Sequence, residues 1–273
     1  MDANDLDVIW NRDILPPLKI RSGTSTEPVT VFLGGQPAAG KTRVQQHLVE
    51  TYGDWLLPIV GDDFRKYHPD YKRLIREDPL SMPYETARAA GYWTGKAVEY
   101  ADTHGVSCII EGTWRNADTV LNEAERAASF GRRTHAVLLA VPPVLSRLGM
   151  LSRFYWDLAA DGQARWTPPE AHERTVAVLP ENVHTIATSG SFDRLSVMDR
   201  SGDFLYDGAD PADFEAVWSD RFKGGLGVDG MAAEQSLVGI ESIRRRFDVG
   251  LAESEPIIQT IRRDLGIWDS AAK

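Results

Sequence analysis

The chain has 273 residues, of which 42% are hydrophobic and 26% are charged, a composition typical of globular proteins and unlike that of disordered ones. Its 40 acidic residues outnumber its 30 basic ones and give a net charge of −10, which disfavours contact with nucleic acid phosphates. We therefore expect no nucleic acid among its partners.

Cys108 is the only cysteine, which excludes a disulfide within the chain and is typical of proteins from a reducing compartment. No apolar run approaches the length that crosses a membrane, and the first residues lack the basic start of a signal peptide. These features predict a cytoplasmic location and no membrane partner.

The first 28 residues are expected to form an arm that leads into the fold. Pro16-Pro17 and the polar segment 22–26 indicate that this stretch does not continue a helix. The short β-rich run 29–33 then ends in two glycines, and helix formers begin at Lys41. The predicted order is strand, glycine-containing loop, helix.

The remaining apolar runs have little polar alternation, which is typical of parallel strands covered on both faces. They lie at 56–60, 107–110 and 135–141, and helical patterns at 84–103 and 117–129 alternate with them. Two short strands at 195–198 and 204–206 follow a helix that a capping box at 167–170 is expected to open. The alternation predicts an α/β fold, a doubly wound and mostly parallel sheet with helical additions.

Residues 35–42 match the phosphate-binding pattern G-x-x-x-x-G-K-[ST] at every fixed position, between a predicted strand and a predicted helix. Such a loop binds phosphates through backbone N–H groups and the N-terminus of the following helix. The predicted nucleotide-binding residues are Gly35, Gln36, Pro37, Ala38, Ala39, Gly40, Lys41 and Thr42. Lys41 would reach the β- and γ-phosphates and Thr42 would bind Mg²⁺. The pattern predicts ATP or GTP with Mg²⁺, and it does not identify an acceptor.

Carboxylates follow the next two apolar runs at the edge of the sheet where ligands bind in α/β folds. Asp62 and Asp63 follow the run 56–60, and Glu111 follows the run 107–110. A kinase needs a carboxylate there to accept the proton of the acceptor hydroxyl and to lie near the metal. Asp62 is therefore a candidate base and a further candidate Mg²⁺ ligand. An Asp-Asp helix cap and a polar turn are the structural alternatives.

Arg153 and Arg165 lie in a later segment rich in tryptophan and tyrosine. Guanidinium groups stabilise the charge that spreads over a phosphoryl group during transfer. Isolated arginines are usually solvated, so the residues alone favour a surface role. We divide the chain into an N-terminal arm at 1–28, a P-loop kinase core with helical substrate-side insertions at 29–225 and a C-terminal helical extension at 226–273.

The motifs at 35–42, 61–65, 110–113, 140–142 and 167–168 resemble, in this order and approximate spacing, the zeta-toxin family. Zeta toxins are kinases of toxin–antitoxin systems. The resemblance therefore implies a P-loop kinase that transfers the γ-phosphoryl of ATP or GTP to the 3′-hydroxyl of UDP-N-acetylglucosamine, with an antitoxin protein as a partner.

The resemblance also implies roles for single residues. Asp62 matches the catalytic base, Lys41 and Thr42 match the ligands of nucleotide and Mg²⁺, and two arginines match the clamps on the transferred phosphate. The implied phosphate clamps are Arg153 and Arg165, and the implied lining of the substrate pocket is Glu111, Thr113 and Arg115.

Two positions depart from the family pattern. Gly95 aligns with an acidic residue that binds the substrate, and Glu123 aligns with a threonine that contacts it. One hydrogen-bond acceptor is thereby lost and one carboxylate is gained. A kinase of the same build for another small molecule, such as a dinucleotide or an antibiotic, is therefore an alternative, and so is a nucleotide-gated binding protein without acceptor chemistry. The presence of Asp62 argues against the latter, since a switch needs no proton acceptor.

Overall fold

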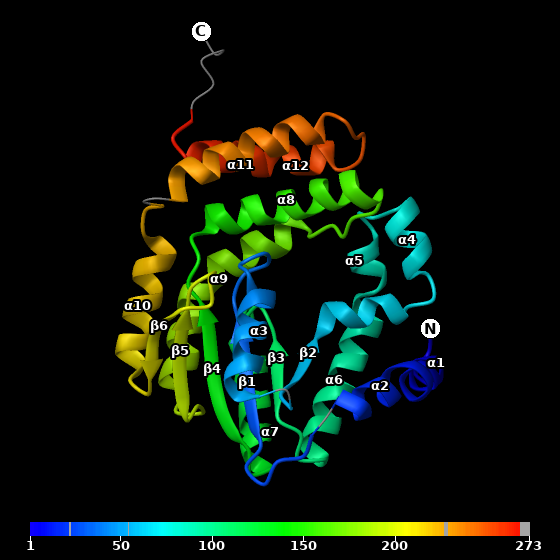
Figure 1. The fold of residues 1–273 in the computed structure, drawn as a ribbon, viewed down its shortest axis with the longest axis vertical. Helices are drawn as coiled ribbons and strands as arrows, with labels where there is room; N and C mark the ends of the chain where they lie inside the picture. Colours follow the sequence, from blue (N-terminus) through cyan, green and yellow to red (C-terminus); the bar gives the residue numbers. More distant parts are fainter. Residues whose placement is uncertain (22, 54, 227–228, 268–273) are drawn as a thin grey trace.

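The computed structural model describes residues 1–21, 23–53, 55–226 and 229–267. Six strands form one sheet in the order β2-β3-β1-β4-β5-β6 (Figure 1). They are β1 Val29–Gly34, β2 Leu57–Val60, β3 Cys108–Glu111, β4 Arg133–Leu139, β5 Arg194–Met198 and β6 Phe204–Gly208. All neighbouring pairs are parallel except β5 and β6. The predicted α/β fold with a mostly parallel sheet is confirmed.

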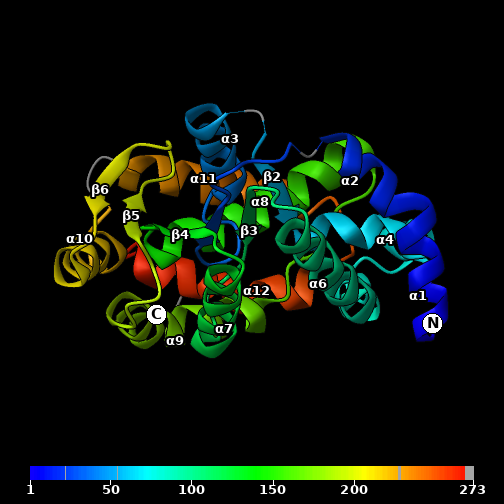
Figure 2. The same cartoon turned by 90° about the horizontal axis from the view of Figure 1, so that it is seen from below.

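Helices cover both faces of this sheet, because successive side chains of a strand point to opposite sides. Val31 and Leu33 of β1 belong to the buried cluster that includes α3, whereas Phe32 belongs to the cluster that includes α7 (Figure 2). The helices are α1 Ala3–Ile9, α2 Leu15–Arg21, α3 Lys41–Tyr52, α4 Tyr71–Glu77, α5 Met82–Glu85, α6 Ala87–Thr103, α7 Ala117–Ser129, α8 Pro143–Asp161, α9 Pro169–Thr188, α10 Pro211–Lys223, α11 Asp229–Arg244 and α12 Leu251–Asp264. A 3-10 helix at Gly61–Tyr67 follows β2. Among the described helices, none is both long enough and apolar enough to cross a membrane.

The N-terminal segment is helical, so the expectation that it does not continue a helix is wrong. A π-helical turn at Trp10–Ile14 joins α1 to α2, and Pro16 and Pro17 lie inside α2. The π turn changes the register of the backbone hydrogen bonds just before two residues that have no N–H to donate. Trp93 of α6 donates a hydrogen bond to the carbonyl of Leu6 at 3.0 Å. Tertiary packing thus holds a helix that the prolines alone argue against.

The C-terminal helices pack on α8, above the sheet in the view of Figure 1. Their buried apolar residues share one cluster with α8 and β1, and they are Ala233, Leu237, Ile240, Ile243, Ile257, Ile258 and Ile261. Arg147 of α8 donates hydrogen bonds to Glu173 of α9 and to Asp264 of α12, each at 2.7 Å. We retain the division into arm, core and extension as a proposal. Residues 22, 54, 227–228 and 268–273 of those segments lie outside the described residues.

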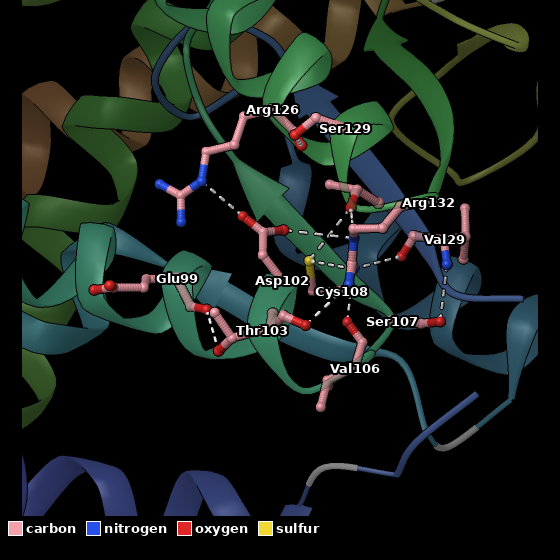
Figure 3. Close-up of polar contacts among 12 residues, drawn as sticks. Val29, Glu99, Asp102, Thr103, Val106, Ser107, Cys108, Arg126, Ser129 and Arg132 are labelled. Carbon is pink, nitrogen blue, oxygen red and sulfur yellow. Dashed lines mark hydrogen bonds and ion pairs between the residues drawn. The ribbon is translucent and has the colours of Figure 1, made fainter. Parts of the chain in front are cut away.

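A buried arginine joins the elements at the amino edge of the sheet, where the parallel strands begin (Figure 3). Arg132 has a fully buried side chain and lies 3.5 Å from Asp102 of α6. It donates hydrogen bonds to the carbonyls of Val29, Ala101 and Val106 at 3.2, 2.9 and 2.6 Å. Because a buried guanidinium needs partners for its donors, this residue ties β1, α6 and the start of β3 together. This network leaves the opposite edge of the sheet, where the parallel strands end, available for ligands.

A second polar network lies at the amino edge, around His135 of β4, which is 1% exposed. Its Nδ1 lies 2.7 Å from the Tyr52 hydroxyl and its Nε2 lies 2.7 Å from Ser196 Oγ. Ser196 in turn donates to Asp207 at 2.7 Å, and Asp207 also accepts from Arg194 at 2.6 Å. A neutral imidazole with its proton on Nε2 satisfies all these contacts. Burial lowers the pKa of His135 to about 3.

We expect the free energy of unfolding to fall as the pH drops from about 6.5 towards 3. His135 should contribute up to about 1.4 kcal/mol of this loss per pH unit. In that window the unfolded chain protonates His135 and the folded chain does not. Urea unfolding between about pH 6.5 and 5 should give a flatter pH slope for His135→Gln than for wild type. Ser196→Ala should lower stability yet keep the wild-type slope, since the histidine remains. An unchanged slope in His135→Gln would show that another group causes it.

Candidate active site

The phosphate-binding loop lies where β1 ends and α3 begins. Gly35 has a φ of 151°, Ala38 a φ of 60° and Gly40 a φ of 106°, so three residues of the loop have positive φ. Loops of this kind at a helix N-terminus form concave arrays of N–H groups that bind anions. Gly40 is the residue that immediately precedes α3. The loop therefore has the backbone of a phosphate site.

Lys41 turns back over this loop. Its Nζ donates hydrogen bonds to the carbonyls of Gly35 at 2.8 Å and Gln36 at 3.1 Å. It also lies 3.9 Å from Oε1 of Glu111, at the end of β3. Burial lowers the pKa of Lys41, and Glu111 opposes that change. Burial raises the pKa of Glu111, and Lys41 opposes that in turn. The predicted lysine and glutamate thus form a buried pair.

Gln36 is wholly buried and anchors the loop to the protein. Its Nε2 donates hydrogen bonds to the carbonyl of Val141 at 2.7 Å and to Ser146 Oγ at 3.3 Å. Its Oε1 has no hydrogen-bond partner among the described residues. Because its side chain points away from the loop, Gln36 can offer a nucleotide only its backbone.

The residues near α3 fit a magnesium ion that binds together with a nucleotide. Thr42 is exposed in the first turn of α3, so its hydroxyl is accessible beside the phosphate loop. Within the described part of the chain, no group of three or more His, Cys, Asp or Glu side chains could hold a metal by itself. Magnesium at phosphate loops keeps several waters and takes phosphate oxygens. One hydroxyl, with Asp62 as a further candidate, therefore meets its needs.

Asp62 lies in the 3-10 helix after β2, where two arginines contact it. Its Oδ1 accepts a hydrogen bond from Arg65 Nε at 2.7 Å, and its Oδ2 lies 3.7 Å from Arg165. Burial favours a raised pKa, but Arg165 and Arg65 outweigh it and lower the pKa of Asp62. The neighbouring Asp63 is exposed and forms no hydrogen bond or ion pair with any described residue. Of the two adjacent carboxylates, only Asp62 is ordered by partners.

Arg153 comes from α8, near enough to Asp62 for the two charges to interact. It donates a hydrogen bond to Thr167 Oγ1 at 2.7 Å, and its buried Nε has no partner among the described residues. Burial and the nearby Arg165 lower the pKa of Arg153, while Asp62 opposes that change. The expected capping box at Thr167 is wrong, because Pro168 is the N-cap of α9 and caps it with no side chain. The hydroxyl of Thr167 accepts a hydrogen bond from Arg153 instead of capping the helix.

The structure therefore brings five of the predicted residues together from separate elements: Lys41, Asp62, Glu111, Arg153 and Arg165. A phosphate loop, an ionised carboxylate and two guanidinium groups at one sheet edge can bind a nucleotide and hold a hydroxyl near its last phosphate.

The zeta toxin family model matches residues 18–210 of the chain. The chain belongs to the zeta-toxin family. It is 30% identical over 185 residues to the toxin PezT of Streptococcus pneumoniae serotype 4, an alignment that covers 67% of this chain and 73% of PezT. It is 29% identical over 180 residues to toxin zeta of Streptococcus pyogenes, covering 66% of this chain and 63% of that protein. The match to toxin zeta thus spans less than two thirds of the relative.

A solved structure from the PezAT chromosomal toxin–antitoxin system of Streptococcus pneumoniae has the same fold. It superposes with a TM-score of 0.75 at 23% identity and covers 89% of this chain and 98% of that chain. The predicted resemblance to the zeta-toxin family is confirmed.

Trp114 shapes the segment after β3, and the sequence analysis did not single it out. Trp114 has a φ of 56° and its ring lies over Gly34, where an added Cβ would come within 2.4 Å of it. Its carbonyl accepts a hydrogen bond from Asn182 at 2.8 Å. Left-handed backbone at a bulky residue is costly and often marks functional sites. Trp114 thereby positions its neighbours Thr113, which is half-buried, and Arg115, which is exposed.

The two departures from the zeta-toxin pattern lie in different places. Gly95 is on the exposed face of α6, where an added Cβ meets nothing within 4 Å. Glu123 of α7 is half-buried, burial raises its pKa, and its charged neighbours are Arg126 and Asp102. Asp102 is part of the amino-edge network of Figure 3, so Glu123 is separated from the candidate site. Gly95, by contrast, has open space beside it.

Arg65 is a second residue whose role the sequence did not indicate. Besides Asp62, it donates hydrogen bonds to the carbonyl of Pro83 and to Thr86 Oγ1, each at 2.7 Å. It thereby fixes the carboxylate of Asp62 against the junction of α5 and α6. No local pattern distinguishes it from a solvated arginine.

We expect Arg65→Gln to lower kcat by about 10- to 100-fold, because it removes the charge-assisted hydrogen bond that holds Asp62. Nucleotide affinity should hardly change, since Arg65 makes no contact with the phosphate loop. Steady-state kinetics and calorimetry with Mg·ATP would separate the two effects. Arg73→Gln, at an exposed arginine that pairs with Asp70, is the control and should match wild type. A loss of nucleotide affinity as large as the loss of kcat would contradict a role in positioning Asp62.

Proposed function

We propose that this chain is a kinase that transfers the γ-phosphoryl of ATP or GTP to a hydroxyl of a small metabolite, with the 3′-hydroxyl of UDP-N-acetylglucosamine as the leading acceptor. The observation that carries the proposal is the meeting of Lys41, Asp62 and Arg165 at one edge of the sheet. Membership of the zeta-toxin family supports the same activity.

Nucleotide binding in this proposal begins with a change of partners for Lys41. In the structure its ammonium is held by the carbonyls of Gly35 and Gln36. Phosphate oxygens are stronger acceptors, so the β- and γ-phosphates draw the ammonium out of the loop. Thr42 would hold Mg²⁺ together with the phosphates, and the ion would supply further positive charge to the phosphate oxygens.

Asp62 serves as the base. Its pKa depends, through Arg165, on whether a nucleotide is bound. A carboxylate next to Arg165 is a weak base, because the cation stabilises its ionised form. A bound γ-phosphate competes for Arg165, which leaves Asp62 with a higher pKa and a greater affinity for the acceptor proton. The hydroxyl oxygen then bonds to the γ-phosphorus as the β–γ bridging bond breaks. Asp62 takes the proton, and the nucleoside diphosphate leaves.

Arg153 and Arg165 clamp the transferred phosphoryl group and spread its charge. The two guanidinium groups are close enough that Arg165 depresses the pKa of Arg153, a repulsion that an anionic phosphoryl group between them relieves. Glu111, Thr113 and Arg115 are proposed to contact the acceptor, because they lie at and just after the carboxyl end of β3, the strand next to β1.

The acceptor is tested by incubating purified protein with γ-labelled ATP or GTP, Mg²⁺ and either UDP-N-acetylglucosamine or a bacterial metabolite extract. Product identification by mass spectrometry should show a phosphorylated sugar nucleotide. A labelled product other than UDP-N-acetylglucosamine phosphate would support the alternative kinase for a dinucleotide or an antibiotic. Nucleotide binding without any labelled product would support the nucleotide-gated binding protein.

Gly95→Glu provides the sharper test of the sugar-nucleotide substrate. An unpaired substrate hydroxyl costs about 1–3 kcal/mol, so a restored acceptor should lower the Michaelis constant for UDP-N-acetylglucosamine by about 10-fold or more. The added side chain has room, since a Cβ there meets nothing within 4 Å. Glu111→Gln should raise the same constant. Gly91→Glu, one turn earlier and equally open, is the matched control. No effect of Gly95→Glu on any sugar nucleotide would contradict this acceptor.

We also propose an antitoxin protein as a partner, because the solved relative comes from the PezAT toxin–antitoxin system. The proposed location is the cytoplasm, in keeping with the single, buried and unpaired Cys108. The net charge of −10 supports the proposal that nucleic acid is not a partner.

A further inference from the structure

His172 of α9 and Ser146 of α8 form a fully buried pair that none of the roles proposed above uses. Nε2 of the histidine lies 2.8 Å from Oγ of the serine, and Nδ1 lies 2.9 Å from Oε1 of Glu173. Hydrolases use the same order of serine, histidine and carboxylate to make a nucleophile. Here neither the serine nor the histidine is exposed, so no substrate can reach the hydroxyl. The pair therefore acts on the protein itself.

The pair contacts the phosphate loop through the side chain of Gln36. Nε2 of Gln36 donates hydrogen bonds to Ser146 Oγ at 3.3 Å and to the carbonyl of Val141 at 2.7 Å. The backbone carbonyl of Gln36 in turn accepts a hydrogen bond from Lys41 Nζ at 3.1 Å. One residue of the loop therefore joins the buried pair to the ammonium that is proposed to hold the phosphates.

The hydrogen bonds of the pair can all run in one direction, from the loop towards Glu173. Ser146 accepts a hydrogen bond from Gln36 and can donate one to Nε2 of His172. With its ring proton on Nδ1, His172 then donates to Glu173. The carbonyl of Pro143 also lies 2.9 Å from Ser146 Oγ, but Nε2 of the histidine has no other donor among the described residues. Successive hydrogen bonds that point the same way strengthen one another in a buried site.

Glu173 fixes the far end of this chain of hydrogen bonds. Arg147 donates to both of its carboxylate oxygens, at 2.8 and 2.7 Å, and also to Asp264 of α12 at 2.7 Å. Burial favours a raised pKa, but the hydrogen bonds from Arg147 and His172 outweigh it and lower the pKa of Glu173 to about 2. An ionised carboxylate is a strong acceptor for the Nδ1 proton. The ring of His172 is therefore fixed in orientation, and with it the hydroxyl of Ser146.

We propose that Ser146 and His172 are positioning residues that act through Gln36. They hold the phosphate loop, and with it Lys41, in the geometry that binds the β- and γ-phosphates. This inference rests on the proposed nucleotide-dependent function. Neither residue contacts a reacting atom. A loop released from this contact would lose part of its fixed shape, and donors that are already in place bind an anion more tightly than mobile ones.

Ser146→Ala tests the proposal, because it removes the hydroxyl that joins Gln36 to His172 and leaves the surrounding apolar core in place. Ser196→Ala is the matched control. It removes a serine hydroxyl from the second buried histidine–serine pair, which lies 2.7 Å from His135 at the amino edge of the sheet. Calorimetry on the full chain would measure the affinities for Mg·ATP and Mg·tripolyphosphate, and urea unfolding would measure stability.

We expect Ser146→Ala to weaken binding of both probes by about 5- to 10-fold, and equally for the two, because the loop is proposed to contact only the phosphates. Ser196→Ala should lose stability and keep wild-type affinity. In a Gln36→Leu background, Ser146→Ala should cause little further loss, since the serine acts through that side chain. His172→Gln, which is long enough to reach Ser146, should bind both probes more tightly than His172→Ala.

Equal affinities of Ser146→Ala and Ser196→Ala for both probes, or an undiminished further loss in the Gln36→Leu background, would overturn the positioning role while leaving the phosphate loop in place. Equal affinities of the two His172 variants would overturn it as well. Failure of the wild-type protein to bind either probe would instead refute the proposed nucleotide-dependent function.

Discussion

Asp62→Asn is expected to lower kcat by at least about 10²-fold while nucleotide affinity stays close to wild type. The amide has almost the same shape as the carboxylate, but it cannot accept the proton of the acceptor hydroxyl. It can still accept a hydrogen bond from Arg65, so the 3-10 helix around it should keep its structure. Single-turnover kinetics with saturating nucleotide, together with calorimetry, would separate the chemical step from binding.

Asp63→Asn is the matched control for this prediction. It removes the same charge one residue away, from an exposed side chain that has no hydrogen bond or ion pair with any described residue. We expect it to retain most of the wild-type rate. Equal losses in the two variants would show that local negative charge, and not a proton acceptor at Asp62, supports the reaction.

Lys41→Ala is expected to abolish detectable transfer and to weaken nucleotide binding strongly. The ammonium both holds the β- and γ-phosphates and offsets the charge that grows on them during transfer, effects that together are worth at least about 10²-fold in rate. The substitution also leaves the carbonyls of Gly35 and Gln36 without their present partner. Calorimetry with Mg·ATP and the labelled-transfer assay would measure both effects.

Lys72→Ala, at an exposed lysine on α4, controls for the loss of one positive charge and should behave as wild type. A circular dichroism melt of Lys41→Ala would show whether the loop variant stays folded. Wild-type turnover in folded Lys41→Ala would refute the assignment of the loop as the phosphate site.

Sequence patterns predicted the elements whose conformation depends on near neighbours. The run 29–33 is apolar except for Thr30 and is buried throughout because both faces of β1 are covered, and such a run indicates a buried parallel strand. The phosphate loop was equally predictable, since its glycines meet backbone requirements within eight residues. The helices at 84–103 and 117–129 were found within a few residues of their bounds.

Local patterns failed where distant packing competes with local preference. Pro16 and Pro17 argue against a helix, yet contacts with α6 and a π turn support one. Thr167 and Glu170 have the spacing of a capping box, but the hydroxyl of Thr167 is taken by Arg153, fourteen residues earlier in the chain. In each case the free energy of tertiary contacts outweighs a local preference, worth about 1 kcal/mol for a helix cap and about 3 kcal/mol for a proline inside a helix.

By itself, the sequence determined the α/β class, the phosphate loop and the resemblance to the zeta-toxin family, because each depends on residues that are close in the chain or on motifs in a fixed order. Only the tertiary structure decided which side chains meet. The pairing of Asp62 with Arg165 and of Lys41 with Glu111 joins residues about 70 to 100 positions apart. Such pairs depend on strand order and helix packing, which no local spacing encodes. The place of α11 on α8 was decided in the same way, by the burial of its apolar residues there.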